Sequence, residues 1–163
     1  MEIVQIPDFR RFSNEDHDGF ADLVNAVHAE FGYSFDPDLD ADLADPLAFY
    51  RHLWVARVGL AVVGSVALTA AVNGVTTLKR MYLRPEFRGQ GWGRHMLDTA
   101  IETAAREGWK RIILDTGAHQ HAAHRLYEFA GFELDRKDGT SMYYSKDLRG
   151  DTVSCWMDTT RGC

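Results

Sequence analysis

The 163-residue chain has few cysteines, few prolines and no long apolar run. Its two cysteines, Cys155 and Cys163, lie in the last nine residues, so they cannot cross-link the body of the fold, and they lack the paired spacing of a zinc site. No segment approaches the roughly 18 apolar residues of a membrane helix, and the first residues lack the apolar core of a secretory signal. We therefore expect free thiols, no membrane span and a cytoplasmic location.

A surplus of basic residues is also missing. The net charge of -6 argues against general nucleic-acid binding. The acidic residues are concentrated at one end, because residues 1–50 hold 12 acids and two bases, whereas residues 51–163 hold 12 acids and 16 bases. Either the two regions face partners of different charge, or both are ordinary solvated surfaces.

Hydrophobic periodicity and turn residues predict one domain over residues 1–148, followed by a loosely ordered tail over residues 149–163. Strands are expected at residues 3–6, 53–58, 62–69, 75–83, 111–115, 132–134 and 141–146. Helices are expected from a capping box at 13–16 to residue 32, and at 45–50, 93–107 and 118–130.

A glycine-rich turn follows the strand expected at 75–83, with the sequence Arg88-Gly89-Gln90-Gly91-Trp92-Gly93. Glycines let the backbone approach a ligand closely, and a helix start offers free N–H groups and a positive dipole end. Together they suit a phosphate or pyrophosphate. The spacing matches neither a Walker A loop nor a Rossmann fingerprint. A purely structural turn is the remaining alternative.

Two separated segments of the sequence resemble one known family. Arg88-x-x-Gly91-x-Gly93 is similar to the acetyl-CoA signature of the GNAT N-acetyltransferases, and Leu126–Phe132 (LYEFAGF) is similar to a later segment of that family, LYxxxGF. The expected order of strands and helices also fits the family from about residue 3 to 147. The resemblance implies an α/β (α+β) fold with a mixed, mostly antiparallel sheet of six to seven strands, splayed into a V and flanked by about four helices.

The resemblance further implies acetyl-CoA as co-substrate and no metal. The pantetheine arm would pair with the backbone near Met81 and Leu83, between the strands at 75–83 and 111–115. Gln120 stands where many relatives carry an asparagine that binds the pantetheine. The basic residues near the turn suit a charged cofactor: Lys79, Arg80, Arg84, Arg88 and Arg94. The pyrophosphate would bind the amides of Arg88, Gly89, Gln90, Gly91, Trp92, Gly93 and Arg94.

By the same resemblance, Tyr127 is the general acid that protonates the departing thiolate, unless it only packs in the core. A backbone N–H near Leu83 would stabilise the oxyanion. The general base is open, because residues 76–80 contain no acid where many relatives carry a glutamate. The alternatives are Asp115, His119 and a chain of water molecules.

Three histidines, His119, His121 and His124, form an H-x-H-x-x-H pattern that raises the question of a metal site. No cysteine lies nearby, and Asp115 is the only neighbouring carboxylate. Solvent-exposed helix residues are therefore the favoured interpretation, with a role in substrate binding or proton transfer left open for one of them.

The function expected from these features is the transfer of an acetyl group from acetyl-CoA to a primary amine of a small cationic molecule. The cation is inferred from the acidic segment after the first helix, which contains Asp36, Asp38, Asp40, Asp42 and Asp45. The alternatives are an amine on a protein, a non-catalytic acyl-CoA sensor, and a metal-dependent hydrolase. No nucleic-acid or membrane partner is expected, and a homodimer is consistent with the family.

Overall fold

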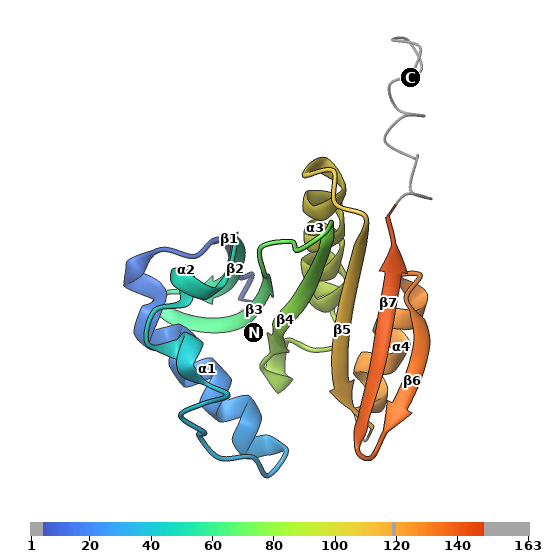
Figure 1. Cartoon of the computed structure of the whole chain (residues 1–163). Helices are drawn as coiled ribbons and strands as arrows, with labels where there is room; N and C mark the ends of the chain where they lie inside the picture. The colour runs from blue at the N-terminus through green and yellow to red at the C-terminus, as the bar shows by residue number, and fades with distance from the viewer. Residues whose placement is uncertain (1–4, 119, 149–163) are drawn as a thin grey trace. The chain divides into compact units, whose positions relative to one another are not determined.

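The computed structural model describes residues 5–118 and 120–148. The expected tail, both cysteines and His119 lie outside these residues. Figure 1 shows the order of the elements, which are β1 (Asp8–Arg11), α1 (His17–Glu30), α2 (Pro46–Phe49), β2 (His52–Val58), β3 (Ala61–Leu68), β4 (Val75–Leu83), α3 (Trp92–Arg106), β5 (Arg111–Gly117), α4 (His121–Phe129), β6 (Glu133–Asp138) and β7 (Ser141–Asp147). Three short 3-10 helices cover Asn14–Asp16, Ala41–Leu43 and Pro85–Phe87.

The seven strands are hydrogen-bonded in the order β1-β2-β3-β4-β5-β7-β6. Every neighbouring pair is antiparallel except β4 with β5, which are parallel. This confirms the prediction of a mixed, mostly antiparallel sheet with four helices. The chain divides into two units. Unit 1 comprises residues 1–70 and 78–100, and unit 2 comprises residues 71–77 and 101–163, so that β4 contributes to both.

In unit 1, α1 presents a buried apolar stripe to the core beside β2 and β3. Its residues Phe20, Leu23, Val24 and Val27 are 0–5% exposed, as the 3–4 residue spacing predicts. Gly19 allows the close approach of helix and sheet, because a Cβ at this position would lie 2.8 Å from the Val62 side chain. The helix ends at Glu30, before a turn.

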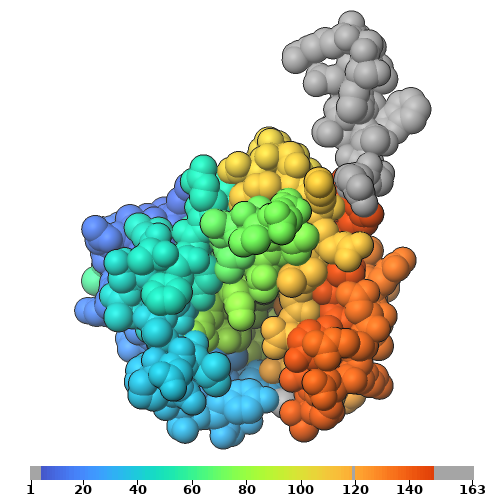
Figure 2. Space-filling model, viewed as in Figure 1, coloured from blue at the N-terminus to red at the C-terminus, as the bar shows by residue number. Residues whose placement is uncertain are grey.

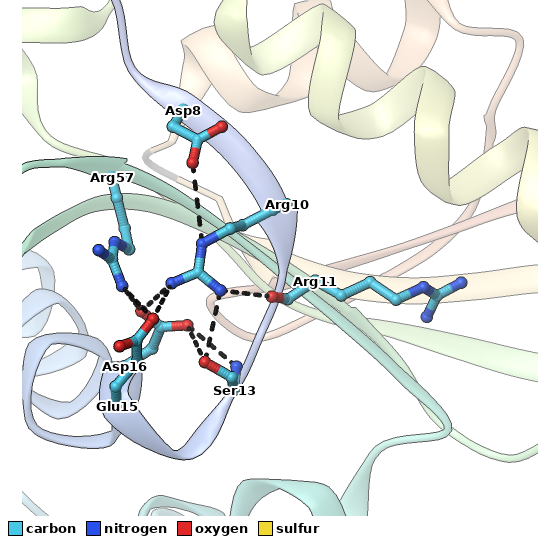
Figure 3. A network of polar contacts seen from close by, with 7 residues as sticks. All are labelled: Asp8, Arg10, Arg11, Ser13, Glu15, Asp16 and Arg57. Atoms are coloured by element: carbon cyan, nitrogen blue, oxygen red, sulfur yellow. Dashed lines mark hydrogen bonds and ion pairs between the residues drawn. The ribbon is translucent and has the colours of Figure 1, made fainter.

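The N-terminal end of α1 is fixed by a buried carboxylate (Figure 3). Asp16 accepts hydrogen bonds from the Ser13 backbone N–H at 2.9 Å, from Arg57 at 2.7 Å and from Arg10 at 3.1 Å, and its side chain is 1% exposed. The Ser13 to Asp16 bond is half of the capping box that the sequence predicts. We call Asp16, Arg10, Arg57, Ser13 and Glu15 the Asp16 cluster.

The edge strand lies further along the chain than expected. The prediction of a strand at residues 3–6 is wrong for residues 5 and 6, because β1 begins only at Asp8 and Ile6 is 79% exposed. Pro7 cannot donate a backbone hydrogen bond, and the pairing with β2 starts after it. The first residue beyond β1, Phe12, anchors the segment because its ring is buried and its N–H donates to Leu53 O at 2.9 Å.

A β-bulge interrupts the pairing of β3 with β4. Ala67 pairs with Lys79 and Ser65 with Tyr82, so β4 has one residue more than β3 between these pairs. Arg80, inside the bulge, has a φ of 51°, a left-handed conformation that is rare for a residue other than glycine. The Ser65 hydroxyl supports it by donating to Arg80 O at 2.6 Å.

In unit 2, β5 lies between the first residues of β4 and strand β7. The buried side chains of Ile112 and Leu114 come from β5, and that of Tyr144 comes from β7. Helix α4 lies behind β7 and β6 in the view of Figure 1. It begins at His121 rather than at residue 118 as expected, because the Ala118 N–H donates to Thr140 O at 2.7 Å.

Among the described residues, no helix has both the length and the apolar character that crossing a bilayer requires. The cytoplasmic location and the single domain over residues 1–148 stay predictions.

Candidate active site

The glycine-rich turn connects β4 to α3 in unit 1. Gly89 and Gly91 adopt φ values of 73° and 91°, which strongly favour glycine. A Cβ at either position would meet no atom within 4 Å. Backbone conformation, rather than tight packing, therefore requires these glycines, and the space around them is open.

Three backbone N–H groups at the start of α3 precede the first hydrogen bond of the helix. The first helical bond runs from the His95 N–H to Gly91 O, at 3.0 Å, so Trp92, Gly93 and Arg94 precede it. Among the described residues, no backbone hydrogen bond is donated by these three amides. Together with the positive end of the helix dipole, they can bind an anion such as a phosphate.

Arg88 connects the turn to other parts of unit 1 through hydrogen bonds. Its guanidinium makes two hydrogen bonds to Glu30, at 2.6 and 2.8 Å, and its Nε donates to Leu83 O at 2.9 Å. The hydrogen bonds from Arg88 hold the pKa of Glu30 below its ordinary value. The amide of Arg88 is also used, because it donates to Pro85 O at 3.2 Å. The sequence carries no signal for Glu30, since nothing local connects a helix end to a turn 58 residues later.

The other polar side chains near the turn also have partners. Arg94 Nε donates to Asp98 at 2.9 Å, Arg84 Nε to Val62 O at 3.1 Å, and Gln90 Nε2 to Glu86 O at 3.0 Å. The expectation that Arg80 helps to attract a charged cofactor is wrong, because its side chain is 8% exposed and paired with two aspartates. The turn thus offers mainly backbone N–H groups.

Met81 and Leu83 lie where β4 pairs on one side only. The parallel pairing with β5 covers Val75–Thr77, whereas the antiparallel pairing with β3 continues to Leu83. Within the described residues, the other edge of β4 beyond residue 77 has no paired strand. A free strand edge can bind an extended ligand through its backbone, as the sequence predicts for the pantetheine arm.

A buried ion-pair cluster joins the β4 bulge to the segment between α1 and α2. Arg80 forms two hydrogen bonds to Asp42, at 2.6 and 2.9 Å, and one to Asp40 at 3.0 Å. Tyr50 also donates to Asp42, at 2.5 Å. The two carboxylates are 4% and 5% exposed. Burial alone would raise the pKa of Asp42, but the hydrogen bonds from Arg80 and Tyr50 hold it below its ordinary value.

His28 and Tyr82 extend this Arg80 cluster. His28 Nε2 lies 3.1 Å from the Tyr82 hydroxyl, and Arg80 Nη1 lies 3.4 Å from both atoms. Burial lowers the pKa of His28 and raises the pKa of Tyr82, which favours the uncharged imidazole and the uncharged phenol. His28 Nδ1 is buried and has no hydrogen-bond partner among the described residues.

In unit 2, Tyr127 and Gln120 lie on or next to α4. The Tyr127 side chain is 5% exposed, and its ring contacts Phe132 and Tyr144, with centroid distances of 5.8 and 6.1 Å. Gln120 precedes α4, and its side-chain oxygen accepts a hydrogen bond from the Thr116 hydroxyl at 3.1 Å. The Gln120 amide nitrogen is the group of this side chain that can donate to a ligand.

The histidine pattern gives a mixed outcome. His121 and His124 both lie on α4, with ring centroids 5.7 Å apart, but only His121 is exposed. The interpretation as solvent-exposed residues is wrong for His124, which is 7% exposed and bonded through Nε2 to Gly117 O at 2.8 Å. Asp115 is exposed on β5. No metal-binding group of three or more ligands occurs among the described residues.

Comparison with known proteins adds to this geometry. The profile of the acetyltransferase (GNAT) family matches residues 20–132, which include most of α1, the whole of β4, the glycine turn and α4. The chain belongs to this family. The match supports the resemblance found in the two sequence segments, and it identifies the protein as an acyltransferase.

Individual GNAT relatives support the assignment. An uncharacterized N-acetyltransferase of Escherichia coli, YjgM, is 33% identical over 79% of this chain and 83% of its own length. N-acetylaspartate synthetase of Danio rerio is 36% identical over 58% of this chain, but this covers only 36% of the relative. Among solved structures, the acetyltransferase yncA of Salmonella typhimurium, with its cofactor acetyl-CoA, superposes with a TM-score of 0.68 at 20% identity, over 87% of this chain and 94% of that one.

Proposed function

We propose that this GNAT protein transfers an acetyl group from acetyl-CoA to a primary amine of a small molecule. The observation that carries the proposal is the start of α3, where three amides that donate no backbone hydrogen bond among the described residues follow two glycines with positive φ. A coenzyme diphosphate is the ligand that best satisfies such amides. The one-sided pairing of β4 near Met81 and Leu83 supports an extended pantetheine beside it.

Calorimetric titration with acetyl-CoA tests the diphosphate site. In Gly91→Ala, a Cβ in a backbone of φ 91° should shift the turn, and we expect at least a tenfold weaker affinity. Gly59→Ala is a matched control in unit 1, because Gly59 also has a positive φ, 62°, and open surroundings. Equal affinities of the two variants, or no binding by the well-folded wild type, would contradict the proposal.

Tyr127 is proposed as the general acid that protonates the departing CoA thiolate. Its place in the LYEFAGF segment supports the role, although its burial among aromatic rings also fits simple packing. In Tyr127→Phe we expect turnover to fall by about 10²-fold or more with acetyl-CoA affinity retained. Tyr144→Phe, another buried tyrosine of unit 2, is the control and should keep its turnover. Unchanged turnover in Tyr127→Phe would remove the assignment.

The acceptor is proposed to be a small cationic amine. Asp38 and Asp45 are exposed in the segment between α1 and α2, which lies at the surface of unit 1 in Figure 2. The attraction is weaker than the composition suggests, because Asp40 and Asp42 are paired with Arg80. A second candidate, an amino acid such as aspartate, is favoured by the similarity to N-acetylaspartate synthetase.

A panel of spermidine, L-lysine, L-aspartate and a lysine-containing peptide separates these acceptors. For a cationic amine we expect the highest kcat/KM with spermidine and a decrease as salt screens the exposed aspartates. A preference for L-aspartate would favour the second candidate, and a preference for the peptide would favour a protein acceptor. Tight binding of acetyl-CoA without turnover of any amine would indicate a sensor.

A further inference from the structure

The reaction needs a group that removes a proton from the amine, and β4 carries no acid at residues 76–80 to serve as this base. The Arg80 cluster, however, contains one neutral nitrogen base. His28, on α1, lies against the hydroxyl of Tyr82, and Tyr82 stands between Met81 and Leu83 on β4. These two neighbours are the residues proposed above to bind the pantetheine arm.

The hydrogen bonds give the Tyr82 hydroxyl a defined orientation. Arg80 Nη1 has only protons to offer, so across its 3.4 Å separation the Tyr82 oxygen acts as acceptor. Arg80 Nη1 lies equally close to His28 Nε2, so this nitrogen also acts as an acceptor, and the Tyr82 proton points to it across 3.1 Å. A phenolic oxygen has two lone pairs, so the second can accept an N–H from an incoming amine. In this arrangement Nδ1 carries the proton of the neutral imidazole.

We propose that Tyr82 and His28 form a proton relay for the acceptor amine, in which Tyr82 meets the amine and His28 receives the proton behind it. The inference rests on the proposed function. The amine nitrogen forms a C–N bond to the thioester carbonyl carbon, and the carbonyl π electrons move to oxygen. The nitrogen then loses a proton to Tyr82 Oη as the Tyr82 hydroxyl proton passes to His28 Nε2.

The remaining protons balance when the C–S bond breaks. The carbonyl re-forms, and the CoA thiolate takes a proton from the general acid, for which Tyr127 is proposed. His28 returns its extra proton to water, and the general acid regains one from water. The net products are the acetylated amine and CoA in its thiol form.

The charges around His28 suit a temporary proton acceptor. The groups that face it are Arg80 and Tyr82 from β4, Asp40 and Asp42 from the segment after α1, and the ring of Tyr33. Burial favours the neutral form of the resting imidazole, which an acceptor requires. With one arginine and two aspartates, the surrounding charge is -1, so a proton on His28 brings the cluster to neutrality. Tyr82, whose pKa is raised by burial, passes protons on without staying ionised.

Steady-state kinetics on the full chain test the relay, with the best amine of the panel above. We expect His28→Gln and Tyr82→Phe each to lower kcat by about 10²-fold, with the Kd for acetyl-CoA unchanged. The double variant should be no slower than the slower single variant, because both residues serve one step. His17→Gln, at an exposed position of the same helix, is the control and should keep wild-type kcat.

The pH profile distinguishes a proton relay from a structural contact. In the wild type, kcat/KM expressed per unprotonated amine should have an acidic limb, falling as the pH drops through the pKa of His28, which burial lowers, because the imidazolium cannot accept a proton. This acidic limb should disappear in His28→Gln. In NMR titration of the protein without substrate, the His28 ring should be neutral at pH 7 and should titrate at a different pH in Tyr82→Phe.

The relay would be overturned by wild-type kcat in His28→Gln, by an unchanged acidic limb in that variant, or by a His28 ring already protonated at pH 7. A parallel loss of kcat, acetyl-CoA affinity and melting temperature would also overturn it in favour of a purely structural role. Failure of the proposed function gives a different pattern, in which the wild type itself acetylates none of the amines. The NMR titration then still decides whether His28 has the protonation state that the relay requires.

Discussion

The Asp16 cluster and the Arg80 cluster both pair arginines with carboxylates, but in opposite proportions. In the Asp16 cluster, one buried carboxylate is bonded by two arginines that remain 29% and 17% exposed (Figure 3). In the Arg80 cluster, one arginine is bonded by two carboxylates, and all three side chains are at most 8% exposed. The first cluster caps a helix at the protein surface. The second fixes the segment between α1 and α2 against the bulge of β4.

The number of acidic residues in the first 50 positions overstates the negative charge that is exposed at the surface. Residues 1–50 carry a strong excess of acids, yet Asp16, Asp40 and Asp42 are buried and neutralised by arginines. Steering of a cationic substrate can therefore use only the exposed remainder. The two clusters should also differ in how much stability they lose when a partner is removed, because their surroundings differ in exposure to water.

Removing Arg80 should have the largest effect. Arg80→Met leaves two buried carboxylates without their cation, and we expect the free energy of unfolding to fall by about 3–5 kcal/mol in urea titrations. Arg80→Lys, which keeps the charge but loses the two-pronged bond to Asp42, should lie between this variant and the wild type. A loss below about 1 kcal/mol in Arg80→Met would show that water reaches the two aspartates easily.

Removing the charge of Asp16 should cost less. In Asp16→Asn, Arg10 and Arg57 keep contact with water and with Glu15, which lies 2.7 and 3.1 Å from them. We expect a loss of about 2 kcal/mol, measured by the same urea titrations, from the weaker hydrogen bonds and the weaker helix cap. A loss equal to that of Arg80→Met would mean that exposure of the partners does not separate the two clusters.

The pKa of Asp42 should shift in opposite directions in the wild type and in Arg80→Met, which makes the cost of removing Arg80 depend on pH. In the wild type, the lowered pKa of Asp42 adds stability above the ordinary aspartate pKa, and this stability disappears as the pH falls through the folded-state value. In Arg80→Met, burial without the arginine raises the pKa of Asp42, so protonation of Asp42 at low pH removes a buried charge and stabilises the variant. The cost of Arg80→Met should therefore shrink by about 1 kcal/mol between pH 7 and pH 4. Unfolding curves at both pH values check this, and a constant difference would contradict it.

The smallest effect is expected at the exposed rim. Glu15 bonds Arg10 and Arg57 with a side chain that is 64% exposed, so Glu15→Gln should change the free energy of unfolding by less than about 0.5 kcal/mol. Thermal melts in low and in high salt provide the measurement. A larger loss that depends on salt would show that the exposed ion pairs of Glu15 contribute measurably to stability.

Local signals predict much of the fold. Strand β4 has the predicted bounds, and α3 begins and ends one residue before the prediction, because proline and glycines punctuate this region. The full length of β6 was missed, since all of Glu133–Asp138 is exposed and shows no alternation to read. Its pairing with β7 gives it its length.

The candidate site divides in the same way. The glycine turn is contiguous in sequence, so its positive φ values and the helix start that follows it could be predicted. The Arg80 cluster joins residues 38 and 40 positions apart, for which the sequence contains no local signal. From the sequence, Arg80 is expected to attract the charged cofactor, and Asp40 and Asp42 are expected to attract a cationic substrate. The fold instead pairs these charges with one another, which removes them from both roles.

Position 80 combines two demands that pull amino-acid choice in different directions. Its left-handed backbone favours glycine, whereas its neighbours Asp40 and Asp42 need a forked cation. A mutational library at this one codon is expected to recover few alternatives to arginine. Redesign of the segment between α1 and α2 therefore has to vary positions 40, 42 and 80 together, because their three charges form one buried group.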